Sequence, residues 1–461
     1  MRVLLISTYE LGRQPFGLAS PAAWLRRAGA DVVARDLSRQ HLDDAGVRAA
    51  DVAAFFLPMH TATRLALPVI ARVRALNPRA RLCAFGLYAP PNRALLGEYG
   101  VEAAFGAEFE ADLVAFVEGR MGEPVQPEAV GTGRRRGAGE PGPVARLTFI
   151  TPDRSGLPPL DRYATLQDRD GRRVVGYTEA SRGCRHLCRH CPVVPIYGGQ
   201  FRIVPVDVVL ADVRNQVATG ATHITFGDPD FFNGPSHGLR IAAALHTEFP
   251  GLTYDVTIKV EHLLRHPEAL PTLRGTGCLF VTSAVESVDD MVLEKLAKGH
   301  TAGDFVRVVD LCRQADLAVA PTFVPFTPWT TLAGYVALLE RVADLDLVEC
   351  VAPVQYGIRL LVPGGSRLLD LPEVRAMAGD FDRAALAHPW AHRDPRVDAL
   401  QREVVSLAGR GQADDRQMAF RRIRQRAYEY AGLAAPAHAI PSRGADSRRP
   451  PVPYLHEPWY C

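Results

Sequence analysis

The stretch TEASRGCRHLCRHCP, residues 178–192, places three cysteines within eight positions, at Cys184, Cys188 and Cys191. The chain has only 8 cysteines in 461 residues, so this local density needs an explanation. In a protein without an export signal, closely spaced cysteines favour metal binding over disulfide formation. The stretch therefore predicts that the three side chains are metal ligands and that their loop is the functional centre.

Two kinds of metal centre fit these ligands. Three thiolates can hold three irons of a 4Fe–4S cluster and leave the fourth iron open to a small molecule. A structural zinc site normally needs four ligands, and His186 or His190 would be available to complete it. We favour the iron–sulfur cluster because no second Cys-x-x-Cys pair follows in the sequence.

Composition and charge describe an ordinary soluble protein. Hydrophobic residues make up 47% and the net charge is +2, which argues against a dedicated nucleic-acid or membrane surface. No apolar run approaches the ~20 residues that cross a bilayer. The opening MRVLLISTYELG reads as a strand and its turn rather than a signal peptide, so we expect a cytoplasmic protein.

The first part of the chain predicts a doubly wound α/β domain. Residues 1–118 alternate short apolar runs with helical stretches, which is typical of a Rossmann-like parallel sheet with helices on both faces. Ligands of such sheets bind beyond the carboxyl ends of the strands, here in the loops 9–17 and 58–63. Residues 119–145 are dense in Gly, Pro and Arg and predict a flexible linker.

The middle of the chain predicts a partial barrel of parallel strands. Across residues 146–370 the strand candidates are VVGYTEAS, HITFGD, TYDVTIK, CLFVTSAVE, LAVAPTFVPF and VAPVQYGIRLLV. Six strand–helix units place an active site at the carboxyl ends of the strands, and the cysteines follow the first strand. Residues 371–461 predict a helical region and a tail with 6 prolines in 23 residues, where we expect no regular structure.

The C-x3-C-x2-C spacing after the first strand of a six-unit partial barrel resembles the radical S-adenosylmethionine (SAM) superfamily. GDPDFF after the second strand, SAVES at the fourth and VAPVQYGIRLLVP near the sixth resemble the segments that contact the amino group, the ribose or carboxylate, and the adenine of SAM. The resemblance therefore implies SAM-binding positions at Gly227, Asp228, Asp230, Glu286, Ser287 and Gln355.

The same resemblance implies a reaction. The open iron of the cluster binds SAM, and one electron from a reductant such as flavodoxin or ferredoxin breaks a carbon–sulfur bond and starts radical chemistry on a small-molecule substrate. Arg182, Arg185 and Arg189 would favour the thiolate form of the cysteines, or they are solvated loop charges. The competing interpretation is an iron–sulfur or zinc protein with no catalytic role.

A doubly wound domain ahead of a radical SAM barrel resembles the cobalamin-binding subclass. In that subclass an Asp-x-His-x-x-Gly loop supplies a histidine to cobalt, but the corresponding loop here reads YELGRQPFG. His60 is a poor substitute, because a lone histidine after a strand is more often structural. The domain therefore binds cobalamin without a histidine ligand or has lost it, and we favour loss; a cobalamin-dependent radical methyltransferase is the alternative reaction.

Further candidates come from the third and sixth strands. Tyr254, Asp255, Lys259 and Glu261 alternate along the third strand, so one set is expected to face the barrel interior and to bind substrate or form an ion pair. Arg359 on the sixth strand is a second possible substrate contact. Four other cysteines are expected to be buried packing residues: Cys83, Cys278, Cys312 and Cys350.

A closer resemblance is to the radical SAM family named for a C-terminal Cys-Cys-Ala-Glu-Pro or Cys-Sec-Ala-Glu-Pro tail. LLISTYELG, HITFGDPDFFNGP, PTFVPFTPWTT and the ending EPWYC all look like that family. The resemblance implies a second thiol or a selenocysteine after Cys461, and a tail that binds a soft element such as selenium or arsenic. The gene is then expected to show UGA after the Cys461 codon.

Overall fold

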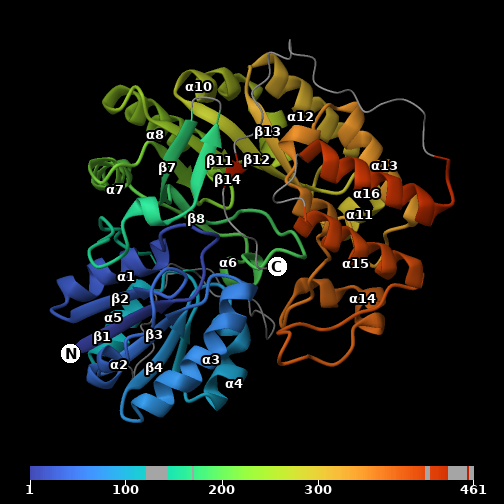
Figure 1. Cartoon of the computed structure of the whole chain (residues 1–461). Coiled ribbons are helices and arrows are strands. Elements are labelled where there is room, and N and C mark those ends of the chain that lie inside the picture. The colour runs from blue at the N-terminus through green and yellow to red at the C-terminus, as the bar shows by residue number, and fades with distance from the viewer. Residues whose placement is uncertain (121–143, 145, 169–170, 411–415, 435–453, 456–461) are drawn as a thin grey trace, which may run out of the picture.

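A computed structural model of the chain describes residues 1–120, 144, 146–168, 171–410, 416–434 and 454–455 (Figure 1). Most of the expected linker, residues 119–145, and most of the proline-rich tail with Cys461 lie outside the described residues. Within the described part, the chain forms two parallel sheets with a helical region beside the second.

The N-terminal sheet has five parallel strands in the order β2-β1-β3-β4-β5. Its strands are β1 (Arg2–Ser7), β2 (Asp31–Asp36), β3 (Val52–Phe56), β4 (Arg81–Phe85) and β5 (Ala103–Phe105). Its helices are α1 (Phe16–Arg27), α2 (Asp44–Ala49), α3 (His60–Leu76), α4 (Arg93–Glu98) and α5 (Glu110–Val117), with a 3-10 turn η1 (Pro90–Asn92).

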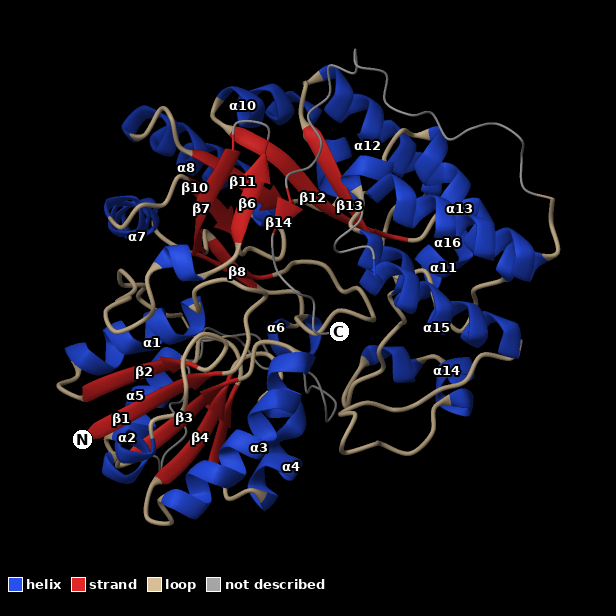
Figure 2. Ribbon diagram, in the orientation of Figure 1, coloured by secondary structure: helices blue, strands red, loops and turns tan. Residues whose placement is uncertain are grey.

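The strands β1, β3 and β4 are buried on both faces because helices cover both (Figure 2), whereas the edge strand β2 buries alternate residues. Along β1, Val3 and Leu5 join the core that includes α1 and α5, whereas Leu4 and Ile6 join the core that includes α2 and α3. The strand order reverses between β1 and β3, and this switch point is where ligands of doubly wound sheets bind.

The second sheet curls around a cavity and has the order β13-β12-β11-β10-β7-β6-β14. Its strands are β6 (Thr165–Asp168), β7 (Gly171–Thr178), β10 (His223–Phe226), β11 (Thr253–Thr257), β12 (Cys278–Glu286), β13 (Ala318–Phe323) and β14 (Tyr454–Leu455). The strands β7, β10, β11, β12 and β13 are parallel, and β6 and β14 are antiparallel.

Helices between the parallel strands cover the outside of this sheet (Figure 2). They are α7 (Val206–Ala218), α8 (Pro235–Glu248), α9 (Val260–Arg265), α10 (Leu270–Gly275), α11 (Asp290–Lys295), α12 (Ala302–Gln314) and α13 (Leu332–Asp344). Short 3-10 turns are η2 (Leu160–Arg162), η3 (Phe231–Asn233), η4 (Pro267–Ala269), η5 (Val348–Cys350), η6 (Pro353–Gly357) and η7 (Arg367–Asp370). The C-terminal helices are α14 (Pro372–Met377), α15 (Pro395–Arg410) and α16 (Arg416–Ala431), the last of which packs on α13.

Two details differ from the sequence prediction. The expected sixth strand, VAPVQYGIRLLV, forms the 3-10 turn η6 and joins the sheet only through one bridge between Phe326 and Arg359. Pro353 lacks the N–H that a strand ladder needs, which is consistent with this outcome. The prediction of no regular structure in the tail was wrong at Tyr454–Leu455, which pair with Gln167 and Leu166 as β14.

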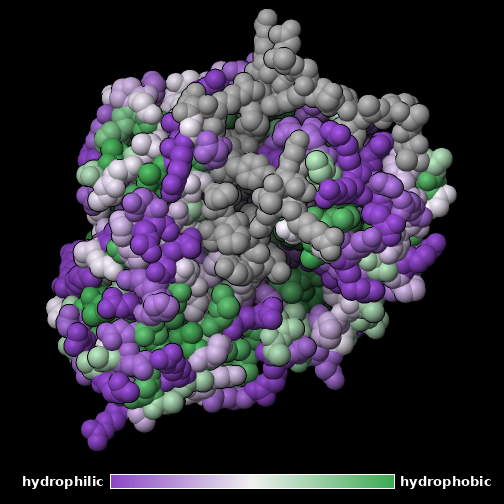
Figure 3. Space-filling model, in the orientation of Figure 1, coloured by the Kyte–Doolittle hydropathy of each residue, from purple (hydrophilic) through white to green (hydrophobic). Residues whose placement is uncertain are grey.

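The described surface is mixed in character. Hydrophilic and hydrophobic side chains are interspersed on the face shown in Figure 3. The large apolar side chains that are exposed are spread along the sequence, from Met1 and Leu65 to Met418 and Leu433. Within the described part of the chain, none of the helices combines the length and the apolar character that a bilayer crossing requires.

Candidate active site at the mouth of the barrel

The loop with the three cysteines starts from a short hairpin. The strands β8 (Ser181–Gly183) and β9 (Phe201–Ile203) pair antiparallel, and α6 (Val194–Tyr197) lies between them. Gly183 has φ +78°, and a Cβ there would lie 2.4 Å from the Tyr197 ring and 2.5 Å from the Gln200 carbonyl oxygen. Only glycine fits at the point where the chain turns into the cysteine loop.

The three cysteines lie close enough to influence one another's titration, and none is in a disulfide. Cys188 is buried, and Cys184 and Cys191 are half-buried. Burial raises the pKa of Cys184 to about 12 and that of Cys191 to about 11. Three soft donors on one loop fit three irons of a 4Fe–4S cluster, whose binding would release the thiol protons.

The neighbouring arginines do not favour the thiolates as the sequence suggested. Arg182 is buried in a cluster of carboxylates, 2.7 Å from Glu110 and 2.8 Å from Glu179. Arg189 donates to the carbonyl oxygens of Glu294 and Lys295, and Arg185 is exposed. Arg182 and Arg189 thus hold the chain around the loop, whereas Arg185 is a solvated loop charge, the alternative that the sequence left open.

The cation beside the cysteines is Lys298, from the loop after α11. Its Nζ donates to Glu286 Oε1 over 3.3 Å, and His190 Nε2 lies 3.1 Å from the same oxygen. Burial alone would raise the pKa of Glu286, but Lys298 and His190 outweigh it and lower that pKa to about 2. Glu286 itself has φ +68°, at a bulge where β12 leaves its register with β13.

A strained, non-glycine residue at the end of a barrel strand is typical of a functional position. Glu286 is an ionised carboxylate at the carboxyl end of β12, on the side of the barrel that carries the cysteines. Ser287 follows it, is buried, and accepts a hydrogen bond from the N–H of Asp289 at the start of α11. The structure therefore places SAVES beside the cluster loop.

The GDPDFF segment also reaches the cluster loop. Both carboxylate oxygens of Asp228 are used there, accepting from the Ala180 N–H over 2.8 Å and from the Ser181 hydroxyl over 2.6 Å. Burial is the main cause that raises the pKa of Asp228 to about 7. Asp228 is thus engaged in holding the chain just before Cys184.

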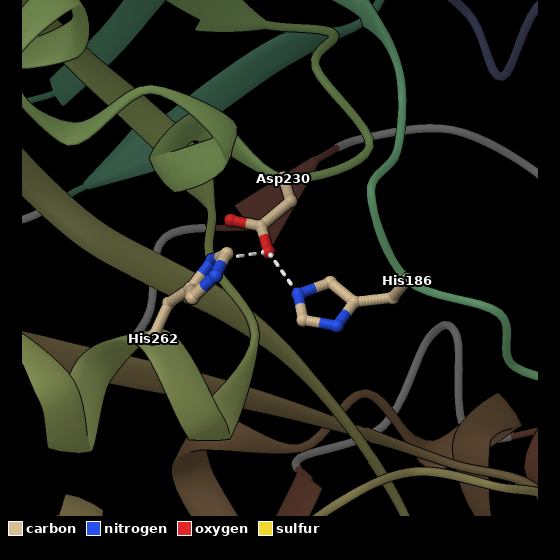
Figure 4. A group of neighbouring side chains, drawn as sticks. All are labelled: His186, Asp230 and His262. Atoms are coloured by element: carbon tan, nitrogen blue, oxygen red, sulfur yellow. Dashed lines mark ion pairs between the residues drawn. The ribbon is translucent and has the colours of Figure 1, made fainter. Parts of the chain in front are cut away.

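Asp230 lies between two histidines (Figure 4). Its Oδ2 is 2.8 Å from His262 Nδ1 and 3.6 Å from His186 Nε2, while its Oδ1 accepts from the Phe232 N–H and caps η3. His262 comes from α9, and sequence reasoning missed it. The signal was present as a histidine directly after Glu261, just past the third strand.

A cavity of about 440 Å³ opens inside the barrel. Four threonines from successive strands face it, together with aromatic walls and two acidic side chains. The lining includes Thr225, Thr257, Thr282, Thr322, Tyr9, Tyr177, Phe226, Phe280, Asp228 and Asp255. Its volume falls in the range of about 300–1,000 Å³ that is typical of small-molecule sites.

The remaining predicted residues divide between the cavity and the framework. Gly227 and Gln355 line the cavity, and Gln355 Oε1 also accepts from the Phe323 N–H. Arg359 is bound to Asp398 and stacks 3.5 Å from the centre of the Trp390 ring, so it ties the C-terminal region to the barrel and does not line the cavity.

The residues predicted on the third strand divide between the cavity and an ion pair, the two outcomes that the sequence left open. Asp255 faces the cavity. Lys259 and Glu261 lie beyond the strand, at the start of α9, and form an ion pair of 3.2 Å beside the cluster loop. Of the packing cysteines, Cys83, Cys278 and Cys312 are buried as expected, whereas Cys350 is half-buried and lines the cavity.

Comparison with known families agrees with this geometry. Residues 178–330 match the family described as the radical SAM superfamily. Residues 178–330 of this chain therefore carry a radical SAM domain. Such a domain uses SAM and a 4Fe–4S cluster, the cofactors that the sequence predicted.

Curated relatives of this radical SAM enzyme include methyl- and methylthio-transferases. The hopanoid C-3 methylase of Methylococcus capsulatus is 26% identical over 347 residues, covering 71% of this chain and 64% of that protein. The ribosomal protein uS12 methylthiotransferase RimO of Chloroflexus aurantiacus is 27% identical over 291 residues, covering 59% and 60%. The chain thus spans less than two thirds of the length of either relative.

Solved structures of cobalamin-dependent radical SAM enzymes share the fold. OxsB with aqua-cobalamin and SAM bound gives a TM-score of 0.67 at 13% identity, covering 94% of this chain and 70% of that one. The methyltransferase TsrM from Kitasatospora setae, with cobalamin and a 4Fe–4S cluster bound, gives 0.58 at 18% identity, covering 75% and 70%. These likenesses confirm a doubly wound domain followed by a partial barrel and helices.

Proposed function

We propose that this radical SAM enzyme holds its cluster with Cys184, Cys188 and Cys191 and acts on a small molecule bound in the barrel cavity. One observation carries the proposal: three free thiols lie at the carboxyl ends of the barrel strands. Their loop begins at Gly183, whose positive φ sets the turn. In parallel barrels this end carries the chemistry.

When bound, the cluster supplies the electron that breaks a carbon–sulfur bond of SAM. The chain's own residues bind and shield the reactants. We assign Glu286 and Ser287 to contacts with the polar part of SAM, since Lys298 keeps Glu286 ionised beside the cysteines. Asp228 positions the cluster loop through Ala180 and Ser181. The aromatic walls of the cavity exclude water from the reacting centre.

The test is anaerobic reconstitution with iron and sulfide, followed by dithionite and SAM. The expected result is about four irons per chain, a brown colour and formation of 5′-deoxyadenosine or another product of SAM cleavage. A chain that takes up zinc in place of iron, or holds a cluster without cleaving SAM, would favour the non-catalytic alternative. Metabolite screening with the active protein then identifies the substrate, and flavodoxin or ferredoxin is expected to replace dithionite.

A second candidate is cobalamin-dependent radical methyl transfer, favoured by the OxsB and TsrM structures and by the domain order. The cofactor would enter the crevice at the β1/β3 switch point. That crevice is a cavity of about 220 Å³, below the range typical of drug-sized ligands, and a corrin is larger still. Gly17 faces the Phe56 ring, which lies where a Cβ on Gly17 would be, at 2.1 Å.

The residues at the crevice thus do not fit a corrin as they stand, and no step is derived through one. No histidine lies in the loop after β1, and His60 Nε2 donates to the Ala385 carbonyl oxygen over 2.5 Å. We expect the wild-type chain not to bind hydroxocobalamin, and Phe56→Ala to open the crevice. Wild-type binding with a spectrum free of histidine coordination would support methyl transfer; a histidine-bound spectrum that disappears in His60→Ala would identify His60 as the ligand.

We also propose that the chain belongs to the radical SAM family that is named for a C-terminal Cys-Cys-Ala-Glu-Pro or Cys-Sec-Ala-Glu-Pro tail. The support is the sequence resemblance alone, because Cys461 lies outside the described residues and the comparisons carry no sign of a soft-element tail. The test is the gene: UGA after the Cys461 codon with Ala-Glu-Pro in frame is expected. A UAA or UAG codon, or a continuation with neither Cys nor UGA, contradicts the proposal.

A further inference from the structure

A second group of metal-type donors lies beside the cysteine loop. His186, Asp230 and His262 each offer one ligand atom, and these three atoms lie within 4.8 Å of one another (Figure 4). They come from three separate segments: the cluster loop, the turn after β10, and α9. Two imidazole nitrogens and one carboxylate oxygen are a common donor set for divalent transition metals.

The three donor atoms have no hydrogen-bond partner within the described residues. This holds for His186 Nε2, Asp230 Oδ2 and His262 Nδ1. His262 and Asp230 side chains are each only 1% exposed, so water does not satisfy them freely. His262 Nδ1 is 2.8 Å from Asp230 Oδ2 without the geometry of a hydrogen bond. Donor atoms that converge in a buried place in this way are suited to binding a cation.

The charge of Asp230 points the same way. A buried carboxylate is normally paired with a cation or bound to a metal. The ammonium group of Lys259 lies beside His186. It is paired with Glu261 over 3.2 Å and not with Asp230. Arg265 is also bound to Glu261. Among the described residues, Asp230 forms its ion pairs with two imidazoles, and its other carboxylate oxygen accepts from the Phe232 N–H.

The second ring nitrogen of His186 has both a carboxylate and an ammonium group near it. Glu261 Oε2 lies 3.6 Å from Nδ1, beyond hydrogen-bond distance, and ligating histidines usually direct their second N–H to a carboxylate or to water. Lys259 Nζ is 3.1 Å from the same nitrogen. If Lys259 donates to Nδ1, then Nε2 carries the proton and the trio is a metal-free polar cluster. The two arrangements are distinguishable by metal content.

We propose that His186, Asp230 and His262 form a mononuclear site for a divalent transition metal ion, with zinc as the expected occupant, next to and separate from the iron–sulfur cluster. Three protein ligands leave a coordination position open for water or a small ligand. The metal would fasten the cluster loop to the turn after β10 and to α9. The proposal does not depend on SAM cleavage.

The test is metal content of the full-length chain by mass spectrometry, after reconstitution and removal of loosely bound ions. The expected result is one zinc in addition to the cluster iron. His262→Gln should weaken zinc binding by more than about tenfold while iron content stays the same, because even outer-shell changes at metal sites cost 10–100-fold. His266→Gln is the matched control, a histidine just past α9 whose side chain contacts Glu268 and the Phe232 ring.

A second measurement separates this site from the cluster. The triple variant Cys184→Ala/Cys188→Ala/Cys191→Ala should still bind one Co²⁺, with visible absorption typical of nitrogen and oxygen ligands and without a thiolate band. Loss of the extra zinc in His262→Gln together with Co²⁺ binding by the triple variant supports the proposal. No zinc in the wild-type chain overturns it. Asp230→Asn that weakens SAM binding but leaves metal content unchanged also overturns it, because Asp230 would then be reserved for the SAM ammonium.

Discussion

The carboxyl edges of the two parallel sheets face each other across one crevice, yet they differ in chemistry. The cavity there is lined by Glu10, Pro58 and Gly86 from the N-terminal sheet and by Tyr177 and Gly227 from the barrel. The N-terminal edge is filled by aromatic rings: Phe85 lies 5.4 Å from Phe56 and 4.8 Å from Phe109, centre to centre. The barrel edge carries thiols, ionised side chains and imidazoles that contact them.

Two buried glutamates, one at each edge, show the same difference between the edges in their pKa values. Burial raises the pKa of Glu108, on the N-terminal side, to about 7, although Arg182 lies 3.7 Å away. Arg182 is shared with Glu110 and Glu179, so it does not offset the loss of water. Glu286 on the barrel side has Lys298 to itself, and its pKa falls to about 2. Similar topology thus supports opposite electrostatics, and the local partners decide which edge holds charge.

The largest expected effect is loss of the cluster. Replacing Cys184, Cys188 or Cys191 singly with Ala should abolish SAM cleavage and lower iron content, because a three-ligand site cannot lose a ligand. Cys83→Ala is the matched control in the N-terminal sheet, where the thiol is fully buried packing. Iron content and SAM cleavage that survive in any of the three variants would contradict the assignment.

The next largest effect concerns the cation at the barrel edge. Lys298→Met leaves Glu286 buried without its ammonium partner, and we expect a loss of about 3–5 kcal/mol in the free energy of unfolding. Lys295→Met, at the end of α11, breaks a pair with Glu373 that is partly exposed and should cost no more than about 1 kcal/mol. Urea unfolding of both variants measures the difference; equal losses would show that Lys298 is no more than a surface charge.

The two glutamates should give opposite pH dependences. Glu286, with a depressed pKa, contributes stability that is present above about pH 4.5 and is lost as the pH falls towards 2. Glu108, with a raised pKa, stays protonated when folded, so its contribution to stability falls as the pH rises from about 4.5 to 7. Each change amounts to about 3 kcal/mol.

The measurement is the free energy of unfolding of the iron-free chain across this pH range, for wild type, Glu286→Gln and Glu108→Gln. The wild-type value relative to Glu286→Gln should decrease on acidification. Relative to Glu108→Gln it should decrease towards neutral pH. If both differences in the free energy of unfolding change with pH in the same direction, the two glutamates do not lie in opposite electrostatic environments.

The smallest effect isolates the turn into the cysteine loop. Gly183→Ala and Gly220→Ala both place a side chain at positive φ, which costs about 1–2 kcal/mol. Nothing lies within 4 Å of a Cβ at Gly220, whereas Gly183 would contact Tyr197 and Gln200. Only Gly183→Ala should therefore cost more than the backbone strain and reduce iron occupancy, as measured by urea unfolding and iron content.

Much of the fold could be predicted because strand and helix periodicity is local. The apolar runs of β1–β5 and of β7 and β10–β13 are short and continuous, and buried parallel strands need that pattern. The cysteine spacing sufficed to predict that the three thiols lie on one loop, and their role as cluster ligands stays a prediction. The sixth barrel strand was predicted from an apolar run that Pro353 interrupts, and the two-residue strand β14 depends on a distant partner, Leu166 and Gln167.

The sequence by itself determined the two-sheet architecture and the cofactor class, because both rest on residues close together in the chain. The three cysteine ligands stay a prediction from the same local pattern. Only the tertiary structure decided which charges meet: Lys298 with Glu286, and His262 with Asp230 and His186. It also decided that Arg359 binds Asp398 and that Phe56 covers Gly17. These residues are far apart in the sequence, so the sequence alone does not show that they meet. Burial and the neighbouring charges then decide which of the side chains are ionised.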